Sequence, residues 1–180
     1  MPIGYHTLRI ARFEIDILLA WFTRFFASII RYGGPTLLII REVASGGIFG
    51  AFTSTPWKES KDFYGNSDCF LFRVFPTVKV MRPRGMRENY MYCNSASRSK
   101  NYDGLSHGIG FGGNSEKPRL YIAESFDGCM ASGVDLTFEA GALLPPPATK
   151  GVPETKFFEI ESLEVWGRYI FLFLLSWHYC

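Results

Sequence analysis

Short apolar runs separated by turn residues constrain the fold of this chain more than any other feature of its sequence. Glycine and proline, at 18 and 10 residues, supply many of the breaks between the runs. Eight runs of strand length are present, at Thr36–Glu42, Ile48–Thr53, Cys69–Phe75, Val78–Met81, Tyr90–Cys93, Gly108–Gly113, Leu120–Glu124 and Phe157–Trp166. This spacing of short strands and turn signals is typical of an all-β sandwich.

The order of the runs predicts several strand pairings. The first two runs predict a hairpin, because only small residues lie between them at 44–47. Tyr90–Cys93 is expected to pair with Val78–Met81 across a turn at Arg82–Glu88. Phe157–Trp166 predicts one strand with a bulge, since its apolar alternation shifts partway along. Gly128–Ala148 is predicted to be mostly loop.

The fold class predicted from these runs is mainly β, within the α+β class. We expect an antiparallel β-sandwich with a few short flanking helices. No alternation of strands and helices is visible, which disfavours a parallel-sheet enzyme fold. Aromatic residues make up 17% of the chain, and their rings pack well on pleated sheets.

The two ends of the chain are apolar and need separate treatment. Residues 15–30 carry apolar side chains at helical spacing, but Asp16 and Arg24 interrupt them. This favours a helix docked on the core over a membrane span, which needs about 20 mostly apolar residues. The C-terminal run Tyr169–Trp177 is too short to span a bilayer.

Composition limits the class of protein. With 180 residues, 47% of them hydrophobic, the chain suffices for one packed domain. The formal net charge of +2 argues against a nucleic-acid partner. Arg82, Arg84 and Arg87 cluster, but a solvated turn is favoured there over a phosphate site. The four cysteines form no CxxC pair, so we expect reduced thiols in the cytoplasm, with Cys69 and Cys93 as core residues.

No pattern of reactive side chains predicts an active site. Gly108–Gly113 fits the spacing of a dinucleotide-binding loop, but no helical pattern follows it, so structural glycines are favoured. His107 is favoured as a loop histidine over a catalytic base, because no nucleophile elbow accompanies it. We therefore expect no catalytic residue and no cofactor.

Metal binding and thiol chemistry are also disfavoured. A calcium site would need four acidic residues to gather, namely Asp103, Glu124, Asp127 and Asp135. Their spacing is not that of an EF-hand loop, so we favour solvated loop carboxylates. Cys129 lies in a polar stretch of sequence, where its thiol could be exposed and redox-reactive. Its neighbour Asp127 would disfavour the thiolate. We expect no metal ligands.

Seven sequence blocks in order resemble the TLDc family over residues 22–167. The blocks are GPTLLII (34–40), IFGAFTSTPW (48–57), FYGNSDCFLF (63–72), YMYCNS (90–95), DGLSHGIGFGG (103–113), LYIAESFDGCMAS (120–132) and FEIESLEVWG (158–167). The resemblance implies a β-sandwich flanked by helices. Residues 1–21 and the tail 168–180 do not match the family pattern, and we treat them as a divergent or non-domain segment and an apolar tail. The domain would then be incomplete on its N-terminal side, with an open sheet edge.

The resemblance also implies how the protein works. Family members are associated with oxidative-stress resistance and lysosomal signalling, without known catalytic residues, and several bind the vacuolar proton-pumping ATPase. We therefore expect a non-enzymatic, monomeric, cytoplasmic protein without a transmembrane span. Its partner would be a protein, namely peripheral ATPase subunits at the lysosomal or vacuolar membrane. Two alternatives remain, a thiol-dependent antioxidant enzyme using Cys69, Cys93 or Cys129, and a lectin-like sandwich that binds sugar.

Overall fold

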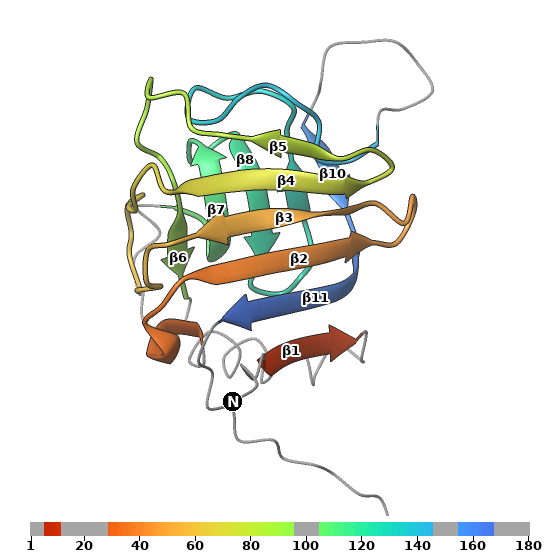
Figure 1. Ribbon diagram of the computed structural model, residues 1–180, viewed down its shortest axis with the longest axis horizontal. Coiled ribbons are helices and arrows are strands. Elements are labelled where there is room, and N and C mark those ends of the chain that lie inside the picture. Colours follow the sequence, from red (N-terminus) through yellow and green to blue (C-terminus); the bar gives the residue numbers. More distant parts are fainter. Residues whose placement is uncertain (1–5, 12–28, 96–104, 146–154, 168–180) are drawn as a thin grey trace, which may run out of the picture.

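Two antiparallel sheets pack face to face in the computed structural model, which describes residues 6–11, 29–95, 105–145 and 155–167 (Figure 1). One sheet has six strands in the order β1-β11-β2-β3-β4-β5, and the other has five in the order β10-β9-β8-β7-β6. The strands are β1 (His6–Ala11), β2 (Thr36–Glu42), β3 (Ile48–Thr53), β4 (Cys69–Phe75), β5 (Lys79–Met81), β6 (Tyr92–Asn94), β7 (Gly108–Gly113), β8 (Pro118–Ala123), β9 (Cys129–Ala131), β10 (Lys156–Phe158) and β11 (Ile160–Gly167). The predicted sandwich is confirmed.

The six-stranded sheet contains the predicted hairpin of β2 and β3. Leu38 opposes Ala51 across this pair, and Ala51 opposes Leu71 on β4. These three side chains are buried, whereas Leu37 and Ile39, at the alternate positions of β2, are partly exposed. One face of the sheet therefore meets the core and the other is turned away from it.

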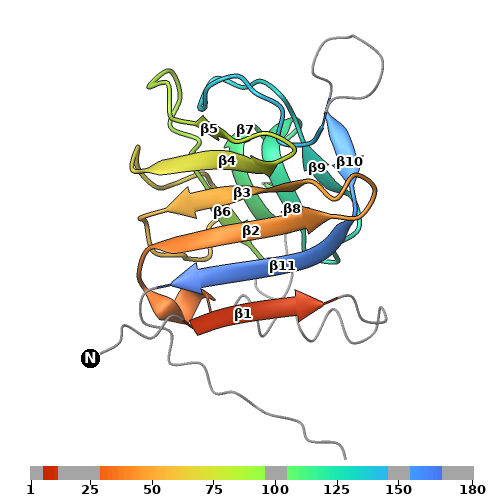
Figure 2. The same cartoon turned by 45° about the vertical axis from the view of Figure 1, so that its right-hand side comes forward.

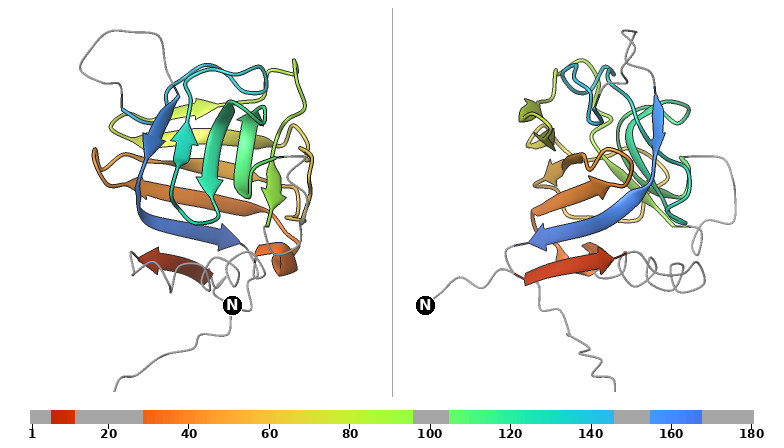
Figure 3. Two further views of the ribbon diagram at one scale, coloured as in Figure 1. Left: turned by 180° about the vertical axis from the view of Figure 1, so that it is seen from behind. Right: turned by 90° about the vertical axis from the view of Figure 1, so that its right-hand side faces the viewer.

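The chain passes from one sheet to the other between β10 and β11. The sequence pattern predicts a single bulged strand at Phe157–Trp166, and this is wrong in part. The bulge is present at Ile160/Ser162, but Phe158 pairs with β9 while Leu163 pairs with β2. Figure 3 shows the two strands running on from one another at the side of the sandwich, one in each sheet. The shift in the alternation marks this change of sheet as well as the bulge.

The pairing expected for Tyr90–Cys93 is also wrong. Strand β6 pairs with β7 in the five-stranded sheet, whereas β5 pairs with β4 in the other sheet. The turn residues between β5 and β6 thus carry the chain from one sheet to the other. In addition, Cys129–Ala131 forms the short strand β9 within a region predicted to be loop.

The N-terminal region is described only in part. Strand β1 lies within residues 1–21 and pairs with β11 at the edge of the six-stranded sheet. Of the helix predicted at 15–30, the structure describes a helical turn at 29–32, in which Ile29 is buried in the core. The rest of that helix and the tail 168–180 lie outside the described residues. Within the described residues, no helix is long and apolar enough to cross a membrane.

Aromatic side chains join the two sheets in the core. The rings of Phe49 and Phe158 meet edge to face at 5.2 Å between centroids, and those of Trp57 and Phe111 at 5.7 Å. The Trp57 indole nitrogen also donates a hydrogen bond to the hydroxyl of Thr36 at 2.8 Å. Burial of these large rings gives the sandwich much of its stability.

Candidate functional site

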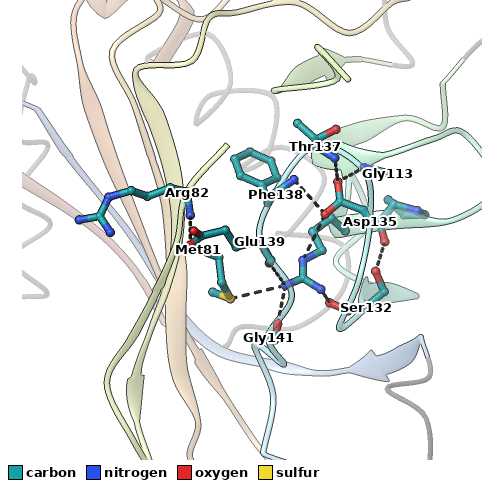
Figure 4. Close-up of polar contacts among 11 residues, drawn as sticks. Met81, Arg82, Gly113, Ser132, Asp135, Thr137, Phe138, Glu139 and Gly141 are labelled. Carbon is teal, nitrogen blue, oxygen red and sulfur yellow. Dashed lines mark hydrogen bonds and ion pairs between the residues drawn. The ribbon is translucent and has the colours of Figure 1, made fainter. Parts of the chain in front are cut away.

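A buried arginine organises one edge of the sandwich. Arg119 on β8 is fully buried, and its guanidinium donates hydrogen bonds to three carbonyl oxygens (Figure 4). The carbonyls belong to Ser132 at 2.5 Å, Glu139 at 3.2 Å and Gly141. Burial lowers the pKa of Arg119 to about 10, against the opposing effect of the nearby Asp135 carboxylate. The arginine therefore fixes the loop at residues 132–141.

Asp135 closes the same loop from the other side. One carboxylate oxygen accepts hydrogen bonds from the backbone amides of Gly113 and Thr137, both at 2.9 Å. The other oxygen accepts one from Phe138 at 3.2 Å and lies 3.7 Å from Nε of Arg119. The prediction that Asp135 is a solvated loop carboxylate is wrong, since its side chain is 3% exposed. It is a structural group that bonds to the backbone.

The loop at 132–141 is also hydrogen-bonded to the chain that follows β5. The amide of Arg84 donates to the carbonyl of Thr137 at 2.8 Å, and the amide of Glu139 donates to the carbonyl of Arg82 at 2.9 Å. Between these bonds, Pro83 and Phe138 form an isolated antiparallel bridge. Arg119 therefore positions the arginine-bearing turn indirectly, through the loop that it holds.

This part of the sandwich carries exposed cations and exposed apolar side chains together, and we name it the basic edge. The cations are Lys79, Arg82, Arg84 and Arg87, all exposed. The apolar members are Val78 at 79%, Met86 at 61%, Val134 at 52% and Leu136 at 49% exposed. Figure 2 shows β5 and the loops around it along the rim of the sandwich. The turn predicted at Arg82–Glu88 is exposed in the structure, which adds the apolar neighbours.

A second candidate surface lies on the outer face of the six-stranded sheet. Trp166, Leu37, Phe52 and Phe70 oppose one another in register on four neighbouring strands, so their side chains share one face. All four are partly exposed, and the rings of Phe52 and Phe70 stack at 5.1 Å. No described element crosses this face in Figure 1. We call these four residues the aromatic row.

The glycines at 108–113 have structural roles, as predicted. They form β7, not a phosphate-binding turn before a helix. A Cβ added to Gly110 would lie 1.9 Å from the ring of Tyr92, and Gly112 has a φ of 62° with Arg119 close by. The spacing of a dinucleotide-binding loop is thus produced by close packing and a left-handed backbone.

The acidic and histidine residues that the structure describes do not gather into a metal-binding group. Asp127 is exposed, Glu124 is partly buried, and Asp103 lies outside the described residues. His107 accepts a hydrogen bond at its backbone carbonyl from the hydroxyl of Tyr121 at 2.7 Å. Across the described ranges, no cluster of three or more candidate metal ligands occurs.

The three described cysteines are buried and reduced. Cys69 and Cys93 are core residues, as predicted, and Cys129 is fully buried although it lies in a polar stretch of sequence. Burial, reinforced by nearby carboxylates, raises the pKa of Cys69 to about 12 and that of Cys93 further. Burial likewise raises the pKa of Cys129 to about 12. These thiols are poor nucleophiles near neutral pH.

Sequence reasoning found the clustered arginines of the basic edge but missed the buried Arg119 network and the aromatic row. Arg119 directly precedes the run Leu120–Glu124, and a charged residue beside a buried strand was a usable signal. The continuous apolar run in β2 was another, because a strand with one core face needs apolar residues only at alternate positions. The additional ones, Leu37 and Ile39, lie on the outer face.

Comparison with known proteins identifies related sequences. The model of the TLDc domain family matches residues 20–169. A zebrafish protein named MTOR-associated protein MEAK7 is 32% identical over 151 residues, covering 81% of this chain and 29% of its own length. The Xenopus laevis protein of that name is 39% identical over 93 residues, covering 52% of this chain and 19% of its own.

A more distant relative carries a different name. Bovine Oxidation resistance protein 1 is 39% identical over 51 residues, covering 28% of this chain and 6% of its own length. The chain therefore spans less than a third of the length of these relatives.

Proposed function

The chain belongs to the TLDc domain family, and we propose that it is a non-catalytic protein-interaction module. Its relatives are named for association with MTOR and for oxidation resistance. The proposed partners are peripheral subunits of the vacuolar proton-pumping ATPase. The protein would act in the cytoplasm, at the lysosomal or vacuolar membrane, and as a monomer.

The aromatic row is the observation that carries this proposal. Four large apolar side chains lie on one face of adjacent strands, and the strand registers fix their positions relative to one another. Aromatic and leucine side chains on a rigid support lose little conformational freedom on binding. Partly exposed apolar side chains gathered on one face of a sheet fit an interaction site better than scattered ones do.

A second row of side chains lies beside the aromatic row on the same face of the sheet. Ile39 opposes Gly50, which opposes Phe72, and Phe72 opposes Val80. Because Gly50 has no side chain, the ring of Phe72 lies over it, within 2.9 Å of the position that a Cβ would take. Phe72 is buried, but Ile39 and Val80 are exposed in part and would extend the face to which a partner protein binds.

The thiol-enzyme alternative has less support than the binding module. All three described thiols are buried, and burial raises the pKa of each. A peroxide-reducing cysteine needs an accessible, stabilised thiolate. The lectin-like alternative rests on no specific feature of the described loops.

Affinity capture from cell lysate tests the proposal. The intact chain is expected to recover peripheral ATPase subunits, identified with antibodies. The variant Phe52→Ser/Phe70→Ser is expected to lose them, because it removes the stacked pair from the aromatic row. A matched variant, Val134→Ser/Leu136→Ser, removes two exposed apolar side chains elsewhere and should keep them.

Circular dichroism and thermal melting establish that each variant is folded. Because Phe52 and Phe70 are partly buried, a second variant, Ile39→Lys, tests the same face with a smaller packing change. Failure of the folded wild-type chain to recover any ATPase subunit would overturn the proposed partner. Equal recovery by all folded variants would show that the aromatic row is not the docking surface.

A further inference from the structure

The apolar side chains of the basic edge project from turns and are not packed in a groove. Val78 lies in the turn between β4 and β5, and Met86 lies beyond β5, directly after Gly85. Val134 and Leu136 lie on the loop held by Arg119. Single exposed apolar residues are ordinary on protein surfaces. Here four apolar residues lie on one edge, each about half exposed or more. Such a group indicates an interaction surface.

The cations of the basic edge are not paired with any carboxylate that the structure describes. Within the described part of the chain, none of Lys79, Arg82, Arg84 and Arg87 forms a salt bridge. Figure 4 shows the Arg82 side chain pointing away from the Arg119 network. The exposed acidic groups of the two loops are Glu88 and Glu139, whereas the side chain of Asp135 is buried beside Arg119. A carboxylate oxygen of Glu139 accepts a hydrogen bond from the amide of Arg82 at 3.1 Å. The edge therefore has an excess of positive charge.

This excess equals the formal net charge of the whole chain. The four cations less the two exposed carboxylates, Glu88 and Glu139, give this edge a formal charge of +2, and the whole chain carries +2. The other charged residues of the chain therefore sum to zero. A molecule with such an asymmetric distribution of charge is oriented by an anionic surface, because that surface attracts one edge and not the others.

We propose that the basic edge docks on an anionic lipid bilayer. The cations contact lipid phosphates and carboxylates, while the apolar tips of Val78 and Met86 enter the region between headgroups and acyl chains. This combination of basic residues with projecting apolar ones fits a membrane interface. An acidic protein would account for the cations but leaves the exposed apolar tips without a role. This inference rests on the proposed location at a membrane and adds the surface that binds it. Vesicle binding and capture of ATPase subunits test the two proposals separately.

The buried network makes the docking edge rigid. Arg119 and Asp135 fix the loop at 132–141, and this loop is hydrogen-bonded to the backbone of Arg82 and Arg84. The cations and apolar tips are therefore presented together before any membrane is present. Prior ordering lowers the conformational cost of binding.

Vesicle co-sedimentation of the intact chain tests the proposal. Vesicles of phosphatidylcholine with phosphatidylserine should sediment the protein, and vesicles of phosphatidylcholine alone should not. Raising the salt concentration should weaken binding, because it screens the charges. The variant Arg84→Glu/Arg87→Glu should bind at least about tenfold more weakly, since each basic side chain near an anionic membrane contributes favourably.

Two further variants separate the contribution of the apolar side chains from that of the cations. Val78→Ser/Met86→Ser should weaken binding but keep its salt dependence, because the cations remain. The matched charge reversal Arg31→Glu/Lys61→Glu alters two exposed cations outside the basic edge and should bind like wild type. If both charge-reversal variants lose binding equally, the attraction is non-specific and the proposal is overturned.

Other results would also overturn the proposal. Equal sedimentation with neutral and anionic vesicles would do so, as would unchanged binding of Arg84→Glu/Arg87→Glu. Competition by a soluble acidic peptide, together with no effect of Val78→Ser/Met86→Ser, would assign the edge to an acidic protein instead. If only the ATPase proposal is wrong, the chain captures no ATPase subunits but still binds anionic vesicles.

Discussion

Arg119 and Asp135 form the buried ion pair on which the basic edge depends. Replacing Arg119 by methionine removes every donor to the carbonyls of Ser132, Glu139 and Gly141 while keeping an apolar side chain of similar length. Removing one partner of a buried ion pair costs about 3 kcal/mol or more. We expect a loss of that size in the free energy of unfolding, measured by urea denaturation.

The control for this prediction is an exposed ion pair of the same chemistry. Arg41 and Glu161 meet at 2.9 Å with about half of each side chain exposed. Arg41→Met should therefore cost less than about 1 kcal/mol. Equal losses for Arg41→Met and Arg119→Met would contradict the structural role assigned to Arg119.

Glu42 predicts a pH dependence of stability. Burial alone raises its pKa, but hydrogen bonds from the Ser45 hydroxyl and from the amides of Ser45, Ala44 and Gly47 outweigh burial and hold the pKa below 4.5. A carboxylate with a lowered folded pKa contributes stability above its unfolded pKa and loses it as the pH falls through the folded value. Glu42→Gln should therefore be less stable than wild type, by about 1 kcal/mol, at neutral pH.

Denaturation curves at several pH values check this prediction. The difference in unfolding free energy between wild type and Glu42→Gln should shrink as the pH is lowered below 4.5. A difference that stays constant from neutral to acidic pH would show that the carboxylate charge has no part in the turn after β2.

The buried thiols predict slow reaction with an aromatic disulfide reagent. In a Cys180→Ser variant, Cys69, Cys93 and Cys129 remain, and burial raises the pKa of all three. We expect little colour from the native protein at neutral pH and complete reaction of the three thiols in denaturant. Rapid reaction of one thiol in the native state would instead revive the thiol-enzyme alternative.

Close packing between β6 and β7 leads to a prediction about these two strands. Tyr92 opposes Gly110, and its ring occupies the space that a side chain at 110 would need. Gly110→Ala should lower the melting temperature strongly, with a cost of roughly 2 kcal/mol from overpacking. Gly47→Ala is the matched control, because a Cβ there would meet its nearest atoms, on Pro145 and Ser45, only at 3.2 Å.

A second substitution tests the cause of that loss. Tyr92→Leu removes the ring and should recover part of the stability lost in Gly110→Ala, as measured by a double-mutant cycle. If the two effects are simply additive, the ring of Tyr92 is not what excludes a side chain at position 110.

The sequence predicts strands in this molecule better than it predicts their partners. Strands β2, β3 and β4 are bounded by clear turn residues, and their limits were predicted correctly. Strand β9 was missed because three residues are too few to show an alternation. The partner of β6 was wrong because a turn between two runs cannot reveal that the chain changes sheets. Asp135 was misjudged because its partner Arg119 is distant in sequence, and only the fold brings them together.

Strand β11 connects the two sheets of the sandwich and pairs with two strands of its own sheet. It lies between β1 and β2 and follows β10, which belongs to the other sheet. A chain ending at Phe158 should therefore lose cooperative unfolding, because β1 and β2 both lose their neighbour. A chain ending at Gly167 should keep the melting temperature of the full chain, as the predicted domain range 22–167 requires. Calorimetry of the two truncated chains checks this.

The central place of β11 also affects when the protein can fold in the cell. Synthesis proceeds at about 5–20 residues per second, so several seconds separate the appearance of β5 from that of β11. During this interval Leu37, Phe52 and Phe70 are already made, but Trp166, on the strand beside them, is not. The nascent chain therefore exposes an unpaired edge of β2 next to an apolar face. A chaperone that shields this edge on the ribosome would prevent aggregation until the last strand arrives.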